Sequence, residues 1–250
     1  MHLVNKNGIP LLQFPHFKTF EKVFHAFTTR QGGSSKVPFE SLNLGFNTGD
    51  VFQRVLLNRK KLLSSLGWRL DSVVTPNQVH GNQVVLVTQE LKDKGAFDHE
   101  SVLHGMDGLI TRAKGIILMI KVADCIPVFL YDPERQAIGI IHAGWRGTAN
   151  GIINRGIKVM IDSFGSKPGN IQAGIGPGIG KCCYQVGKDV WNAFRGRGNR
   201  DSSIWRTEKG KKLYLDLKKA IFLELIGSGL KNESSYLLPS KHGRPGEGRH

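Results

Sequence analysis

Three apolar, β-branched runs follow one another near the middle of the chain and lead into an amphipathic pattern. The runs are Ile116–Val122, Ile126–Tyr131 and Ala137–His142, and their length and composition are typical of buried strands. The next segment, Thr148–Phe164, carries apolar residues at helical spacing and is followed by Gly165, a common helix terminator. Buried strands must be covered by other layers, so this segment predicts a fold of the α/β or α+β class.

Strand patterns and helix patterns alternate along the rest of the chain. Further strands are predicted at Val23–Thr29, Ser72–Thr75 and Gln83–Thr88, and further helices at Val51–Leu66, Val186–Phe194 and Asp216–Ile226. No Pro/Gly/Ser-rich linker divides these elements. We therefore expect a single domain spanning residues 1–250.

The chain is strongly basic, with 35 Lys and Arg against 20 Asp and Glu and a net charge of +15. Such a charge attracts phosphate groups, either on a nucleic acid or on a small anion. No aromatic pattern of an RNA-binding module accompanies the charge, so a small anion is favoured over a nucleic acid as the ligand. A basic protein that binds nucleic acid without catalysis is therefore the less favoured hypothesis.

The expected environment is the cytoplasm, and no membrane association is expected. The three cysteines include the adjacent pair Cys182 and Cys183, which does not suit a disulfide framework. No apolar run approaches the roughly 20 residues that span a bilayer. The sequence predicts no particular oligomeric state.

The turn Asp132–Arg135 separates two of the apolar runs and predicts a hairpin. If this hairpin is centred between Pro133 and Glu134, Cys125 lies directly opposite His142. Cβ atoms of such a pair are about 4.5–5.5 Å apart. The two side chains are then close enough to bind one metal ion together, or for the histidine to activate the thiol.

A third metal ligand is available in the turn-rich segment Pro76–Gly81, which contains His80. Two histidines and one cysteine leave one tetrahedral position of zinc open, as in catalytic zinc sites. Without a metal, Cys125 and His142 would instead be the nucleophile and base of a hydrolase or deamidase. A cysteine in an apolar strand is also commonly a small core residue.

Two glycine-containing segments raise the question of anion binding. The segment His142–Gly147 leads into the predicted helix, so free N–H groups and Arg146 predict a phosphate or carboxylate site. The segment Gly174–Gly180 lacks the spacing of phosphate-binding loops and predicts tight turns instead. Cys182 and Cys183, which follow it, are predicted to be packing residues.

Seven short motifs occur in this order: HAFTTRQGG (His25–Gly33), SLNLGFNTGD (Ser41–Asp50), NQVHG (Asn77–Gly81), MDGLIT (Met106–Thr111), VADC (Val122–Cys125), HAGWRG (His142–Gly147) and GPGIGKCCYQVG (Gly176–Gly187). In these motifs the chain resembles the YfiH/laccase-domain family, also called the multicopper polyphenol oxidoreductase family. The resemblance implies an α+β fold of four layers, α/β/β/α, with mixed β-sheets, similar to a deamidating toxin domain that uses a Cys–His pair.

The resemblance also implies an activity. Members of this family are zinc-dependent purine nucleoside phosphorylases that also deaminate adenosine and cleave methylthioadenosine. Purine nucleosides and inorganic phosphate are therefore the expected substrates. The implied ligands of one zinc ion per chain, which are also the catalytic residues, are His80, Cys125 and His142. The implied substrate-binding residues are Arg30, Asn43, Gln78 and Arg146.

Copper is the less expected metal, despite the family's second name. A multicopper oxidase needs many imidazoles, commonly in His-x-His pairs, and this chain has nine histidines and no such pair. The end of the chain, from about residue 232 to residue 250, departs from the family pattern. We expect a truncation or reading-frame change there, with the loss of any basic residue that this segment gives to the site.

Overall fold

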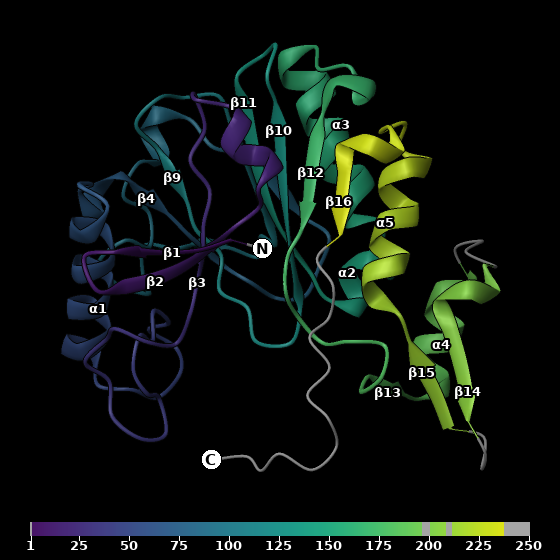
Figure 1. Cartoon of the computed structure of the whole chain (residues 1–250), viewed down its shortest axis with the longest axis horizontal. Coiled ribbons are helices and arrows are strands. Elements are labelled where there is room, and N and C mark those ends of the chain that lie inside the picture. The colour runs from purple at the N-terminus through teal and green to yellow at the C-terminus, as the bar shows by residue number, and fades with distance from the viewer. Residues whose placement is uncertain (1, 197–200, 209–211, 238–250) are drawn as a thin grey trace.

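The computed structural model describes residues 2–196, 201–208 and 212–237 (Figure 1). Its largest sheet has six strands in the order β16-β12-β10-β11-β8-β6. The bounds in chain order are β6 Val84–Leu86, β8 Gly108–Thr111, β10 Ile126–Asp132, β11 Ala137–Ala143, β12 Gln172–Ile175 and β16 Ser235–Leu237. The three inner pairs are antiparallel, and the outer pairs β12-β16 and β6-β8 are parallel, so the sheet is mixed as expected.

β10 and β11 form the predicted hairpin in the middle of this sheet. Every residue of β10 is buried, as expected for a strand with both faces covered. Asp132 closes the turn, because its Oδ1 accepts hydrogen bonds from the backbone N–H groups of Glu134 and Arg135 at 3.0 and 3.1 Å.

The register of the hairpin differs from the predicted one. Pro127, and not Cys125, lies opposite His142. The turn is centred one residue later than expected, and its last residue, Gln136, has a left-handed φ of 50°. A shift of two residues keeps a side chain on the same face of a sheet. Cys125 and His142 therefore still share a face, as diagonal neighbours instead of a directly opposed pair.

Helices cover one face of the six-stranded sheet. They are α2 Trp145–Ala149, α3 Ile152–Phe164 and α5 Leu217–Gly227, and α4 Lys188–Gly196 packs against α2. In Figure 1, α3 and α5 run alongside the sheet. The largest apolar core lies between them and includes Ile126 and Ile141 from the sheet, Ile153 from α3 and Ile221 from α5. The predicted helices at 186–194 and 216–226 are confirmed as α4 and α5.

The helix predicted across Thr148–Phe164 is wrong as a single element. The chain leaves helical geometry at Asn150, and Gly151 has a left-handed φ of 77°. A glycine adopts this conformation with little strain, so the direction of the chain changes between two helices. The segment that follows His142 is consequently the short helix α2, and α3 begins beyond it.

Small sheets and one helix cover the other face. The strands are β1 His2–Lys6, β2 Ile9–Gln13, β3 Phe27–Thr28, β4 Val73–Val74, β5 Pro76–Asn77, β7 Leu103–His104 and β9 Ile117–Leu118. They form the sheets β1-β2-β3, β4-β9 and β5-β7. Beyond them lies α1, Phe52–Ser65, at the left of Figure 1. Two further apolar cores lie between these layers, one packed against the six-stranded sheet and the other against α1. This arrangement confirms the α/β/β/α order.

The remaining elements lie at the edges. β13 Gln185–Val186, β14 Trp205–Glu208 and β15 Lys212–Leu215 form a further three-stranded sheet. Six 3₁₀ turns span His16–Thr19, Leu70–Ser72, Gln89–Leu91, Pro168–Asn170, Ser202–Ile204 and Asn232–Ser234 in the described part of the chain. Of the divergent end, residues 238–250 lie outside the described residues. No described helix is long and apolar enough to cross a membrane.

Two of the predicted strands are largely wrong. Ile116–Val122 contains only the two-residue strand β9, which pairs with β4 and not with the hairpin. Val23–Thr29 contains only β3. From Leu118 the chain instead crosses as an irregular segment to Cys125, which brings that thiol to the open end of the hairpin.

Candidate metal centre

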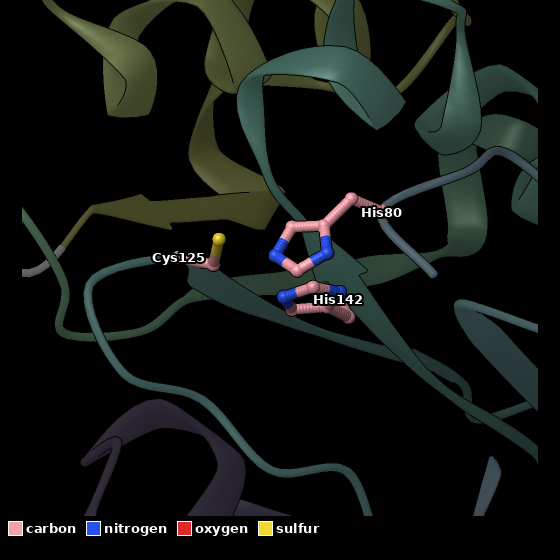
Figure 2. Close-up of side chains that lie close together, drawn as sticks. All are labelled: His80, Cys125 and His142. Carbon is pink, nitrogen blue, oxygen red and sulfur yellow. The ribbon is translucent and has the colours of Figure 1, made fainter. Parts of the chain in front are cut away.

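The structure brings His80, Cys125 and His142 together at the open end of the β10–β11 hairpin (Figure 2). One donor atom from each residue lies within 4.8 Å of the others. His142 belongs to β11, Cys125 directly precedes β10, and His80 lies in the loop after β5. Three segments that are distant in sequence therefore supply two imidazoles and one thiol to a single point.

Asp107, which the sequence reasoning missed as a functional residue, holds two of these ligands. Its Oδ1 lies 2.8 Å from Nδ1 of His142 in the fully buried interior. The same carboxylate accepts hydrogen bonds from the backbone N–H groups of Val79, His80 and Gly81, at 3.2, 2.9 and 2.8 Å. Because a carboxylate only accepts, the Nδ1 atom of His142 carries a proton toward Asp107, and Nε2 is the ring nitrogen that can bind a metal ion.

Two of the ligands depend on left-handed backbone. His80 itself has a φ of 60°, and Asp124, directly before Cys125, has a φ of 72°. Residues other than glycine rarely adopt this conformation. The hydrogen bonds from 79–81 to Asp107 hold the first segment. A hydrogen bond of 2.8 Å from the backbone N–H of Ile179 to the carbonyl of Asp124 holds the second.

Gly144 keeps a side chain away from the ligands. A Cβ atom at this position would lie 3.1 Å from Sγ of Cys125 and 3.2 Å from Cδ2 of His80. Any side chain there would crowd both ligands. Two imidazole nitrogens and one thiolate sulfur form a donor set that zinc and other transition metals accept. The residues present therefore fit a metal ion.

Charges at the centre perturb both histidines. Burial lowers the pKa of His142, but hydrogen bonds to Asp107 and Cys125 and their negative charges outweigh it and raise the pKa to about 9. Burial, followed by the charge of His142, lowers the pKa of His80, and the charge of Asp107 opposes this shift. The two rings meet edge to face, with centroids 4.8 Å apart.

A cavity of about 1690 Å³ lies beside the centre, and His80 and His142 line part of it. Of the residues expected to bind substrate, Arg30, Asn43 and Gln78 also line it. Arg30 is exposed and bonds to the carbonyl of Glu40 at 2.9 Å. Both imidazoles of the centre therefore form part of the cavity wall.

Asn43 and Gln78 both make internal hydrogen bonds. The side-chain amide of Asn43 donates to Thr48 and Asp50 at 2.7 and 3.1 Å. The side chain of Gln78 donates to the backbone carbonyl of Lys121 at 2.7 Å and accepts from its N–H at 2.9 Å. These two residues therefore position loops of the cavity wall.

Arg146 lies in α2 outside the residues that line the cavity, with its guanidinium 4.5 Å from the centroid of the Trp145 ring. α2 has only five residues. The helix after the His142–Gly147 segment is therefore much shorter than expected, and the anion site expected at its start stays a prediction. The charge of Arg146 still reaches the centre, where it contributes to the lowered pKa of His80.

The glycine-rich segment 174–180 packs closely against the centre, as expected for tight turns. A Cβ on Gly178 would lie 2.7 and 2.9 Å from the backbone carbonyl oxygens of Asp124 and Cys125, which only glycine allows. The prediction that Cys182 and Cys183 are packing residues is wrong for Cys183, which is exposed.

Asp107 and Lys121 are the residues of this region that sequence reasoning did not single out. Asp107 lies in the motif MDGLIT, so a signal existed, but nothing local connects it to a histidine 35 positions away. Lys121 is the one charge within the apolar run Ile116–Val122, and that interruption was its signal.

Comparison with known proteins identifies the family. Residues 24–240 match the family model described as multi-copper polyphenol oxidoreductase laccase. The chain belongs to this family. The purine nucleoside phosphorylase YlmD of Geobacillus stearothermophilus is 37% identical over 211 residues, which are 84% of this chain and 77% of that protein. The adenosine deaminase RL5 of an unknown prokaryotic organism is 31% identical over 94% of this chain and 88% of its own length.

Solved structures of this laccase family have the same fold. Bacillus licheniformis YfiH, described as a hypothetical protein, superposes with a TM-score of 0.88 at 35% identity, over 93% of this chain and 86% of that one. YlmD from Geobacillus stearothermophilus gives the same TM-score and identity, over 95% and 87% of the two chains. This chain therefore has the fold of its laccase-family relatives, together with a group of side chains that can hold a metal ion.

Proposed function

We propose that this chain is a zinc-dependent purine nucleoside phosphorylase, which also deaminates adenosine and cleaves methylthioadenosine. The observation that carries the proposal is the convergence of His80, Cys125 and His142 at the wall of a large cavity. Relatives named purine nucleoside phosphorylase and adenosine deaminase support the two kinds of reaction. All three cysteines are free thiols, which supports a cytoplasmic enzyme.

Zinc suits the donor set better than a cluster of copper ions. One group of His, Cys and acidic side chains with metal-ligand spacing occurs among the described residues, whereas a multicopper centre needs several. A bound zinc ion would supply Lewis-acid chemistry, which activates a water molecule toward the purine ring during deamination.

The protein's own residues prepare this site. Asp107 fixes the ring of His142 and the backbone of 79–81, so that both imidazoles stay aimed at one point in the absence of ligand. Preorganised ligands of this kind need no reorganisation when the reaction begins. We propose Arg30, Asn43, Gln78 and Arg146 as the residues that bind or position the nucleoside, in agreement with the family resemblance.

A metal-free cysteine hydrolase or deamidase is the second candidate, and the contact between Cys125 and His142 favours it. The hydrogen bond and the charge of Cys125 are among the causes that raise the pKa of His142 to about 9, which suits a histidine paired with a thiol nucleophile. His80 separates the two candidates. It is a ligand in the zinc enzyme, whereas the hydrolase needs only Cys125, His142 and the orienting Asp107.

Metal analysis of the purified, untagged protein tests the proposal, together with turnover of adenosine in the presence and absence of inorganic phosphate. We expect about one zinc per chain and phosphate-dependent release of adenine. His80→Ala should lose both the zinc and the turnover while keeping its fold. His104→Ala, which changes an exposed histidine of β7, is the control and should keep both. Full turnover by His80→Ala would contradict the zinc assignment and favour the hydrolase.

A further inference from the structure

The cavity beside the metal centre is lined by positive charge without negative charge. Its basic lining residues are Lys22, Arg30, Arg69, Arg112, Lys114 and Lys121. Within the described chain, no Asp or Glu lines it. Two of the arginines are exposed and have carboxylate partners at the rim: Arg30 pairs with Glu40, and Arg69 pairs with Asp71. The remaining lining is largely apolar, so the cavity favours a ligand with an anionic group.

Lys121 differs from the basic residues at the rim because it is half-buried in the wall. Both backbone polar groups of Lys121 are held by the side chain of Gln78. Its Nζ donates a hydrogen bond of 3.3 Å to the carbonyl of Pro76. No carboxylate of the described residues lies within ion-pair distance of this ammonium group.

The surroundings of Lys121 make its charge unfavourable without a ligand. Burial, followed by the charge of Arg59, lowers the pKa of Lys121 to about 8. Arg59 is itself a cation, so it gives Lys121 no compensating charge, and its guanidinium bonds to the backbone carbonyls of Leu44, Gly95 and Ala96. An uncompensated cation in a partly desolvated wall is stabilised when an anion binds beside it. An anionic ligand would therefore bind and stabilise the charged form at the same point.

Position relative to the metal centre connects Lys121 to the reaction. Gln78, which holds the backbone of Lys121, lies two residues before the ligand His80. Lys121, His80 and His142 all line one cavity. Its volume of about 1690 Å³ exceeds the roughly 300–1,000 Å³ of ordinary small-molecule sites. A nucleoside and a separate anion can thus occupy it together.

We propose that Lys121 binds inorganic phosphate inside this cavity, as the anion that phosphorolysis consumes. The assignment of this anion rests on the proposed function, whereas the anion site itself rests on the cavity and its unpaired ammonium group. A lysine ammonium is a compact positive charge suited to phosphate oxygens. The site differs from the one expected at Arg146, which lies outside the cavity lining.

Phosphate binding and kinetics of three variants test the inference. Lys121→Met removes the charge and keeps the apolar stem, and Lys121→Arg keeps the charge. Lys60→Met removes an exposed lysine of α1 outside the cavity and controls for net charge. For Lys121→Met we expect the KM for phosphate to rise at least tenfold, with less than a twofold change in the KM for adenosine. Lys121→Arg should stay within a fewfold of the wild type, and Lys60→Met should match it.

Equilibrium dialysis of radiolabelled inorganic phosphate, with and without adenine, provides a readout that needs no turnover. Lys121→Met should bind phosphate at least tenfold more weakly than the wild type under both conditions. Unchanged phosphate binding, or dependence on Arg146 but not on Lys121, would overturn the inference while leaving the phosphorylase proposal intact. Lys121-dependent binding in an enzyme without phosphorolysis would instead support the anion site and refute the proposed function.

Discussion

Replacement of Asp107 by asparagine is the sharpest perturbation of the metal centre. The carboxylate serves four donors, with His80 N and His142 Nδ1 at Oδ1 and the N–H groups of Val79 and Gly81 at Oδ2. An asparagine side chain has one oxygen and one NH₂ group. In either orientation of the amide, its NH₂ group faces two donors and leaves them without an acceptor.

The expected losses follow from this arrangement. A buried donor without a partner costs about 1–3 kcal/mol, so Asp107→Asn should lower the free energy of unfolding by roughly 2–6 kcal/mol. Each kcal/mol corresponds to about 2–4 °C in Tm for a chain of this size. Since the orienting contact to His142 is also weakened, the affinity for zinc should fall about 10- to 100-fold.

The affinity is measured by competition with a chromophoric zinc chelator, and the stability by thermal unfolding of the metal-free protein. Asp132→Asn is the matched control, since Asp132 is also fully buried but lies at the opposite end of β10. Its Oδ1 accepts two backbone hydrogen bonds and its Oδ2 has no partner in the described structure. Asparagine can keep both bonds there, so a smaller loss of stability and an unchanged zinc affinity are expected.

An Asp107→Asn protein that binds zinc as tightly as the wild type would refute the orienting role of the carboxylate. Equal losses of zinc affinity in Asp107→Asn and Asp132→Asn would refute it as well. The effect would then come from general destabilisation of the sheet.

Three further predictions concern other parts of the structure. Gly144→Ala should lose zinc while keeping its Tm within a few degrees, because the new Cβ crowds Cys125 and His80; retention of one zinc per chain would contradict this. Burial, assisted by the charge of Lys18, lowers the pKa of His25 to about 4. The neutral folded histidine then stabilises the fold above pH 6.5, and about 3 kcal/mol is lost as the pH falls toward 4. Urea unfolding at pH 7 and 5 measures this, and His25→Gln should flatten the dependence. Arg59→Met leaves three backbone carbonyls without their donor and should cost at least about 3 kcal/mol in urea unfolding.

The central hairpin was predictable because its signals are local. The apolar runs of β10 and β11 and the turn after Asp132 are contiguous in the sequence. The register was missed because it depends on whether the turn takes two or four residues, and Gln136 gives no sign of its left-handed conformation. Cys125 and His142 nevertheless lie close together, since sheet faces repeat every two residues.

Features that depend on distant segments were not predictable. Asp107 reaches His142 because β8 pairs with β11, which no local pattern reveals. The short strand β9 was expected to be long and buried, but its run joins the small sheet with β4 and then leaves it. Helical spacing in 148–164 continued through Gly151, so periodicity alone concealed the change of direction between α2 and α3.

His80 supplies its ligand from a backbone conformation that costs about 1–2 kcal/mol for any residue with a side chain. A glycine at this position would relieve that cost, and an asparagine would reduce it. The fold thus gives up stability to direct an imidazole at the metal centre. A lineage with this fold that ceased to use its metal would gain stability by drifting to glycine or asparagine here. The residue at position 80 therefore indicates whether a chain with this fold favours an imidazole or a relaxed backbone at this point.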